Sequence, residues 1–144
     1  MIYLDSSALV KRYLREDGTD FIQSLLRETE VFATSKLTYP EIISAFMKKR
    51  RVGEMNRKTL EAVIDKFEND WEKIFVIEFH NELLPGVKKL IEKYPLRGAD
   101  ALHLASALWL DRTLRMGLTF VASDVGLLKA ARSEALKILN PQRY

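Results

Sequence analysis

The chain has 144 residues, a length typical of one domain, and 47% of them are hydrophobic, which is enough to form a core. It carries 23 Lys and Arg against 20 Asp and Glu, a net charge of +3 that is compatible with a polyanionic partner. It contains no Cys, which excludes disulfides, thiolate metal sites and a cysteine nucleophile. We therefore expect a single domain over residues 1–144, in which any metal is held by oxygen or histidine.

The longest stretch without a charged residue is Ala101–Leu110, about half of the roughly 20 residues that a membrane-spanning helix needs. The first residues have no basic segment ahead of an apolar stretch and do not resemble a secretory signal. We expect a cytoplasmic protein that does not cross a membrane.

Short apolar runs predict strands, and longer segments of helical period predict the helices between them. The expected strands are Ile2–Leu4, Val31–Ala33, Phe75–Ile77, Leu118–Ala122 and Lys137–Leu139. The expected helices are Ala8–Arg15, Phe21–Arg27, Glu41–Arg51, Leu60–Trp71, Leu83–Tyr94, Ala101–Leu114 and Gly126–Ala135. Apolar strands that alternate with helices predict an α/β fold, a Rossmann-like three-layer α/β/α sandwich around a parallel sheet of four to five strands.

Four carboxylates stand where strands give way to helices. Asp5 follows the first strand, Asp124 follows the Leu118 strand, and Glu41 opens the helix after the Val31 strand; Asp100 begins the Ala101 helix. Ligand sites of parallel sheets lie at the carboxyl ends of the strands. Four acids gathered there repel one another and need a cation, and all-oxygen ligands suit Mg²⁺ or Mn²⁺. The chemistry that such a site supports is metal-assisted hydrolysis of a phosphodiester.

A simpler interpretation applies to each acid taken alone. Asp5, Asp100 and Asp124 each precede a helix and can act as N-caps, which contribute about 1 kcal/mol. Glu41 follows Pro40 and can complement the helix dipole. The metal hypothesis depends on the occurrence of all four acids together.

Four segments carrying these acids resemble the motifs of the PIN domain family, and within it the VapC-type toxin ribonucleases. They are Tyr3–Tyr13 (YLDSSALVKRY), Leu37–Phe46 (LTYPEIISAF), Leu96–Leu108 (LRGADALHLASAL) and Phe120–Ala131 (FVASDVGLLKAA). The third is the most specific, and the resemblance extends over essentially the whole chain.

The resemblance implies that Asp5, Glu41, Asp100 and Asp124 form the metal-binding and catalytic quartet. It also implies endoribonuclease activity that depends on Mg²⁺ or Mn²⁺, a homodimer, and inhibition by a VapB-type antitoxin. Its first motif gives Ser6 a supporting or substrate-binding role, with a helix cap as the alternative. Many relatives have Thr or Ser two positions before the fourth acid, where this chain has Ala122, and Ser123 is the adjacent hydroxyl.

The basic residues Lys11, Arg12 and Arg97 flank the acidic motifs, and we expect them to contact RNA, Arg97 above all. The denser run Lys48–Arg51 fans around a helix end, which favours a solvated surface. His103 lies three residues after Asp100, but apolar neighbours favour a hydrogen-bonded core residue over a metal ligand.

Two other functions remain open. A PIN-like protein without catalytic activity would bind RNA or protein as a regulator, and Ala122 is compatible with lost activity. A housekeeping nuclease that processes RNA would have the same carboxylates and no antitoxin. Dinucleotide binding is excluded, since no Gly-rich fingerprint follows the first strand.

Overall fold

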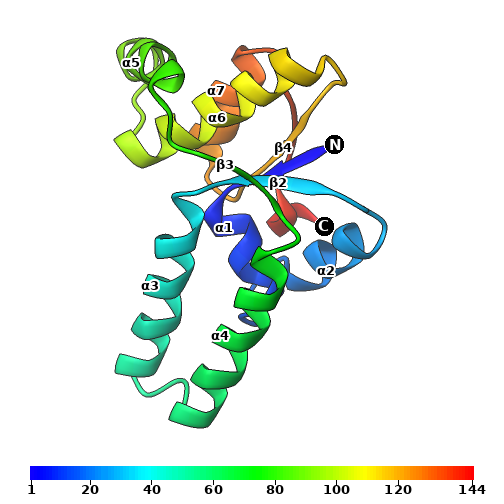
Figure 1. Cartoon of the computed structure of the whole chain (residues 1–144), viewed down its shortest axis with the longest axis vertical. Coiled ribbons are helices and arrows are strands. Elements are labelled where there is room, and N and C mark those ends of the chain that lie inside the picture. The colour runs from blue at the N-terminus through cyan, green and yellow to red at the C-terminus, as the bar shows by residue number, and fades with distance from the viewer.

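The computed structural model describes residues 1–144 and has a sheet of five parallel strands at its centre (Figure 1). The strands are β1 (Ile2–Leu4), β2 (Phe32–Ser35), β3 (Phe75–Ile77), β4 (Thr119–Val121) and β5 (Lys137–Leu139). Their spatial order is β3-β2-β1-β4-β5, so the first strand of the chain is the central one. Tyr3 lies opposite Ala33 on one side and Phe120 on the other. The predicted parallel α/β sheet is confirmed.

Seven α-helices and three short 3₁₀ turns connect the strands. The helices are α1 (Ser6–Leu9), α2 (Thr19–Arg27), α3 (Thr38–Arg51), α4 (Arg57–Trp71), α5 (Leu84–Lys93), α6 (Gly98–Leu114) and α7 (Val125–Ser133). The 3₁₀ turns are η1 (Val10–Arg12), η2 (Asn81–Leu83) and η3 (Pro141–Arg143). None of the helices combines the length and the apolar character that crossing a membrane requires.

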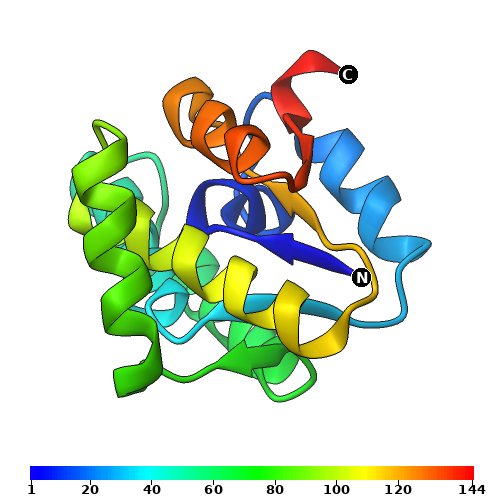
Figure 2. The same ribbon diagram turned by 90° about the horizontal axis from the view of Figure 1, so that it is seen from above.

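Two separate cores lie on the two faces of the sheet, which makes the three layers visible in Figure 2. Successive strand residues point to opposite faces, so Tyr3 and Phe120 enter one core while Leu4 and Val121 enter the other. The first core is completed by α5, α6 and α7, and the second by α1 to α4. Helices on both faces explain why the strands read as continuous apolar runs.

Helices α3 and α4 form a hairpin that extends beyond the sheet (Figure 1). An aromatic cluster joins them to η1, and its members are Tyr13, Tyr39, Phe46, Phe67 and Trp71. The rings of Phe46 and Phe67 are fully buried and meet edge to face with centroids 5.9 Å apart. Packing therefore occupies these aromatics.

Some boundaries differ from the sequence-based ones, and hydroxyl groups explain the most important difference. β2 runs on to the buried Thr34 and Ser35, whereas the apolar run ended at Ala33. Thr34 Oγ1 donates to the Leu4 carbonyl at 2.6 Å and pairs with Thr38, and Ser35 Oγ accepts the Leu37 N–H. These bonds start α3 at Thr38, so Glu41 lies in its first turn rather than at its first residue.

The first and sixth helices also differ. α1 ends at Leu9 and tightens into the 3₁₀ turn η1, where the Tyr13 N–H bonds the Val10 carbonyl, instead of running to Arg15. α6 begins at Gly98, which puts Asp100 in its first turn.

Candidate functional site

Asp5 is fixed at the end of the central strand. Its Oδ1 accepts hydrogen bonds from the Ala8 N–H at 3.0 Å and from Ser7 Oγ at 2.7 Å, which makes it the N-cap of α1. Burial raises the pKa of Asp5, and the negative charge of Asp100 adds to this, against the lowering effects of His103 and of the two hydrogen bonds. The side chain is 4% exposed, so its charged form is costly without a cation nearby.

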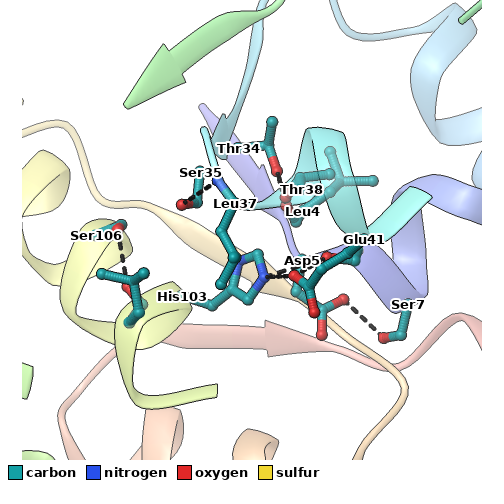
Figure 3. A network of polar contacts seen from close by, with 12 residues as sticks. Leu4, Asp5, Ser7, Thr34, Ser35, Leu37, Thr38, Glu41, His103 and Ser106 are labelled. Atoms are coloured by element: carbon teal, nitrogen blue, oxygen red, sulfur yellow. Dashed lines mark hydrogen bonds and ion pairs between the residues drawn. The ribbon is translucent and has the colours of Figure 1, made fainter. Parts of the chain in front are cut away.

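Glu41 reaches the same place from the first turn of α3. Its Oε1 accepts a hydrogen bond from Ser6 Oγ at 2.5 Å and lies 2.7 Å from His103 Nε2 (Figure 3). Burial acts to raise the pKa of Glu41, but the hydrogen bonds from His103 and Ser6 outweigh it and hold the pKa below its usual value. Glu41 is therefore an ionised group with two fixed donors.

His103 links Glu41 to the core. The ring is 2% exposed, and its Nδ1 lies 2.9 Å from the hydroxyl of Tyr3. An ionised carboxylate can only accept, so Nε2–H donates to Glu41, while Nδ1 forms the hydrogen bond with the Tyr3 hydroxyl. The sequence indicated a hydrogen-bonded core histidine, which the structure confirms, but it gave no sign that Glu41 and Tyr3 are its partners.

Asp100 and Asp124 complete the acidic group. Burial raises the pKa of half-buried Asp100, and the negative charges of Asp124 and Glu41 raise it further, against smaller effects of His103 and Arg97. Asp124 is exposed and caps α7, where its Oδ1 accepts the Leu127 N–H at 2.7 Å. The four acids, which come from four different segments, thus lie at one edge of the sheet within electrostatic reach of one another.

The acids do not form a closed ligand set in this structure. No three Asp, Glu or His side chains are arranged as a metal-binding group. Three of the four have protein partners instead: Asp5 and Asp124 accept backbone N–H groups as helix caps, and Glu41 accepts from Ser6 and His103. Asp5 and Asp124 therefore act as helix caps and also interact electrostatically with Asp100.

Ser123 has the most unusual environment of the hydroxyl residues. Its N–H donates to Ser7 Oγ at 3.1 Å, which joins the fourth motif to the first. Its own Oγ is buried and has no hydrogen-bond partner in the protein. Buried hydroxyls are normally paired, so this atom is free to bind water or a ligand beside Asp124. Ala122, directly before it, is fully buried and contributes no hydroxyl.

The three expected RNA contacts lie in different surroundings. Lys11 is 2% exposed, and its ammonium lies 2.8 Å from Glu16, because the tight turn η1 directs it into the protein. Arg12 is bound to Asp70 on α4 at 2.8 Å. Only Arg97, at the N-cap of α6, is exposed and close enough to lower the pKa of Asp100. The structure thus makes Lys11 inaccessible to a phosphate and leaves Arg97 as the best placed cation.

A cavity of about 810 Å³ lies elsewhere, between α5, α6 and the end of α7. None of the four carboxylates lines it. This cavity is therefore separate from the acidic site.

Comparison with known proteins identifies the family of the chain. Residues 2–133 match the model of the PIN domain family. The chain is 34% identical over 112 residues to Ribonuclease VapC45 of Mycobacterium tuberculosis, covering 75% of each chain, and 29% identical over 140 residues to Ribonuclease VapC46 of the same species, covering 97% of each. A toxin–antitoxin complex from Klebsiella pneumoniae has the same fold, with a TM-score of 0.68, 14% identity and 98% of both chains covered. The chain belongs to the PIN domain family.

Proposed function

We propose that the chain is an endoribonuclease of the VapC toxin type, which hydrolyses RNA phosphodiester bonds with a divalent metal ion held by Asp5, Glu41, Asp100 and Asp124. The observation that carries this proposal is the position of Asp100 among the other acids: the charges of Asp124 and Glu41 raise its pKa, and its own charge raises the pKa of buried Asp5. Membership of the PIN family and 34% identity to a VapC ribonuclease support RNA as the substrate.

The chemistry of the donors suits a hard metal ion, although their positions in this structure do not form a metal-binding group. The donors are carboxylate oxygens, which hard cations such as Mg²⁺ and Mn²⁺ prefer, and no thiolate is available in the chain. Burial and the charges of neighbouring acids raise the pKa of Asp5 and Asp100. A bound cation would reduce the repulsion between the acids and offset the cost of burying their charged forms. The unpaired Ser123 hydroxyl suits a water molecule of a hydrated ion. VapC-type ribonucleases are metal-dependent as a class; we propose Mg²⁺, with Mn²⁺ as a substitute.

When bound, the metal would activate a water molecule and neutralise charge on the phosphate. The residues of the chain position the ligands. Ser7 and the Ala8 N–H hold one oxygen of Asp5 and leave the other available, and the Leu127 N–H does the same for Asp124. Ser6 and His103 orient Glu41. Arg97 would bind a phosphate of the substrate beside Asp100.

We propose further that the chain acts as a homodimer and is inhibited by a VapB-type antitoxin. The similar fold in a solved toxin–antitoxin complex supports this partner. A gene for a short antitoxin-like protein next to that of this chain would distinguish a toxin from a housekeeping nuclease. Co-expression with that neighbour should then give a complex that no longer cleaves RNA.

The deciding experiment compares the purified protein with its Asp5→Asn and Asp100→Asn variants on total RNA, with Mg²⁺, with Mn²⁺ and with EDTA. Asn can still cap a helix, so the fold should survive, while loss of a ligand charge should lower cleavage more than about 100-fold. Asp65→Asn, an exposed change on α4, is the matched control and should cleave normally.

Two outcomes would reject the proposal. Full cleavage by both variants would exclude the carboxylate mechanism. No metal-dependent cleavage by the parent protein would favour the non-catalytic regulator, for which the missing hydroxyl at Ala122 is the supporting feature.

A further inference from the structure

A second pocket lies beside the carboxylates, between α7, β5 and η3. Its volume is about 300 Å³, and one wall is the face of α7 that carries Leu128, Lys129 and Arg132. The opposite wall comes from the end of β5 and from η3, with Asn140 and Arg143. Figure 2 shows the C-terminal segment (red) beside α7 (orange).

The charged residues of this pocket are all positive. Lys129, Arg132 and Arg143 line it, and no Asp or Glu does. All three are exposed, and none of them takes part in an ion pair, whereas Lys93 on α5 is paired with Glu134. Three unpaired cations around one small cavity repel one another and would be stabilised by a bound anion.

The pocket begins one residue beyond Asp124 on the same helix. α7 begins at the residue after Asp124, and Val125, which follows, already lines the pocket. At the helical rise of 1.5 Å per residue, Lys129 and Arg132 lie about 8 and 12 Å from Asp124 along the helix axis. A single strand of RNA that reaches the carboxylates can span this distance with its next few nucleotides.

The pocket also offers an aromatic surface. Tyr144, at its rim, is 74% exposed and stacks on Phe21 with ring centroids 4.4 Å apart and an angle of 14° between the planes. This stacking holds the ring in place and leaves most of it accessible. Cations next to an exposed aromatic ring are the combination with which proteins bind single-stranded nucleic acid.

We propose that this pocket is a binding subsite for the backbone phosphates of the RNA strand that flank the scissile bond, with Lys129, Arg132 and Arg143 as the contacting residues. The inference rests on the proposed ribonuclease function, because it takes the strand in the pocket to be the strand that is cut. An acidic segment of a partner protein is the competing occupant. RNA is favoured because the helix that carries Lys129 and Arg132 begins beside Asp124 and because the pocket has an aromatic rim.

The test measures binding of a fluorescein-labelled single-stranded RNA oligonucleotide in EDTA, where no cleavage occurs, at several salt concentrations. The double variant Lys129→Ala/Arg132→Ala changes two exposed helix positions to the best helix former and should fold normally. Loss of two phosphate contacts should reduce the slope of log K against log salt by about 1.4 and weaken binding about 20-fold at 0.1 M salt. With metal present, KM for RNA should rise more than kcat falls.

Lys137→Ala is the matched control, because Lys137 is an exposed cation on β5 that does not line the pocket. It should bind RNA as the parent protein does. An unchanged slope and affinity in the double variant would overturn the subsite, and so would equal losses in the double variant and the control. Unchanged RNA binding with lost binding of a poly-glutamate peptide would assign the pocket to an acidic protein and overturn the RNA subsite.

These results separate the two proposals. If the parent protein cleaves RNA and the double variant binds it normally, only the subsite is wrong. If the parent protein binds RNA through the pocket but cleaves none with any metal, the subsite stands as a binding site and the ribonuclease proposal is wrong.

Discussion

His103 donates a hydrogen bond from Nε2 to Glu41 Oε1 at 2.7 Å, although 62 residues separate them in the chain. We predict that His103→Ala lowers RNA cleavage about 10- to 100-fold and raises the metal concentration needed for half-maximal activity, because Glu41 then keeps only Ser6 as a donor. Cleavage measured during a Mn²⁺ titration checks this.

Tyr3→Phe is the control for that variant. It removes the hydroxyl that is hydrogen-bonded to His103 Nδ1 but keeps the bond from His103 to Glu41. Both variants leave a buried polar atom unpaired, which costs about 1–3 kcal/mol of stability. Equal losses of cleavage in the two folded variants would show that stability, rather than the position of Glu41, is responsible.

Ser123→Ala should separate activity from stability. Because the Ser123 Oγ is buried without a partner, its removal leaves the free energy of unfolding unchanged or slightly raised. If the hydroxyl binds a water molecule beside Asp124, cleavage falls at the same time. Urea unfolding and RNA cleavage on the same preparation test both parts, and a variant with normal cleavage would give Ser123 no role in the site.

Arg97→Ala should weaken RNA binding more than Lys49→Ala. Arg97 is exposed next to Asp100, whereas the ammonium of Lys49 lies 2.6 Å from Glu54 and is already neutralised. Removing one phosphate contact with Arg97→Ala should reduce the slope of log K against log salt concentration by about 0.7, and Lys49→Ala should leave this slope unchanged. A larger loss for Lys49→Ala would move the RNA path to the α3–α4 hairpin.

The charge of Asp70 should contribute to the stability of the fold in a way that depends on pH. Burial acts to raise its pKa, but hydrogen bonds from Arg12 and Tyr13 outweigh this and hold the pKa below its usual value. A lowered pKa in the folded state stabilises the fold above the pKa of the unfolded chain, about 3.9, and this is lost as the pH falls through the folded value.

Asp70→Asn should therefore be less stable than the parent protein at pH 7, with a difference that shrinks below about pH 4. Urea unfolding across that range measures it. Asp65→Asn, an exposed position on the same helix, serves as control and should follow the parent curve. A difference for Asp70→Asn that stays constant with pH would show that its charge is not involved.

Gly18 precedes α2 and packs against Pro141 of η3, so this position should not tolerate a side chain. Its φ is +90°, and a Cβ there would lie 2.8 Å from the backbone of Pro141. We expect Gly18→Ala to lower stability by about 1–3 kcal/mol. Gly53→Ala, with φ of +77° and open space around it, bears only the conformational cost of about 1 kcal/mol. Thermal unfolding that ranks the two equally would mean that Pro141 moves aside.

The sequence predicted the class of fold well because burial on both sides of a parallel sheet makes each strand a short apolar run. It could not predict that β1 is central, since that depends on pairing with β4 more than 100 residues away. The end of β2 was missed because Thr34 and Ser35 are buried polar residues satisfied by hydroxyl hydrogen bonds. Apolar periodicity does not register such residues.

The site was predictable to the extent that it follows strand ends. Asp5 and Asp124 follow strands β1 and β4, whereas Glu41 and Asp100 lie in the first turns of α3 and α6, and α6 follows a helix rather than a strand. Their role as metal ligands stays a prediction. The partners of His103 were missed because Tyr3 and Glu41 are distant in the sequence, and the alanines and leucines around His103 give no information about them. Lys11 was misplaced because the change from α1 to the turn η1 rotates its side chain toward Glu16.

The hydrogen-bonded connection from Tyr3 through His103 to Glu41 joins β1, α6 and α3. Asp124 follows β4 in the chain. A growing polypeptide on the ribosome therefore cannot assemble the acidic edge until β4 and Asp124 have been synthesised. Until then the proposed ribonuclease lacks one of its four acids, which leaves an inhibitor time to meet the chain before it can damage RNA.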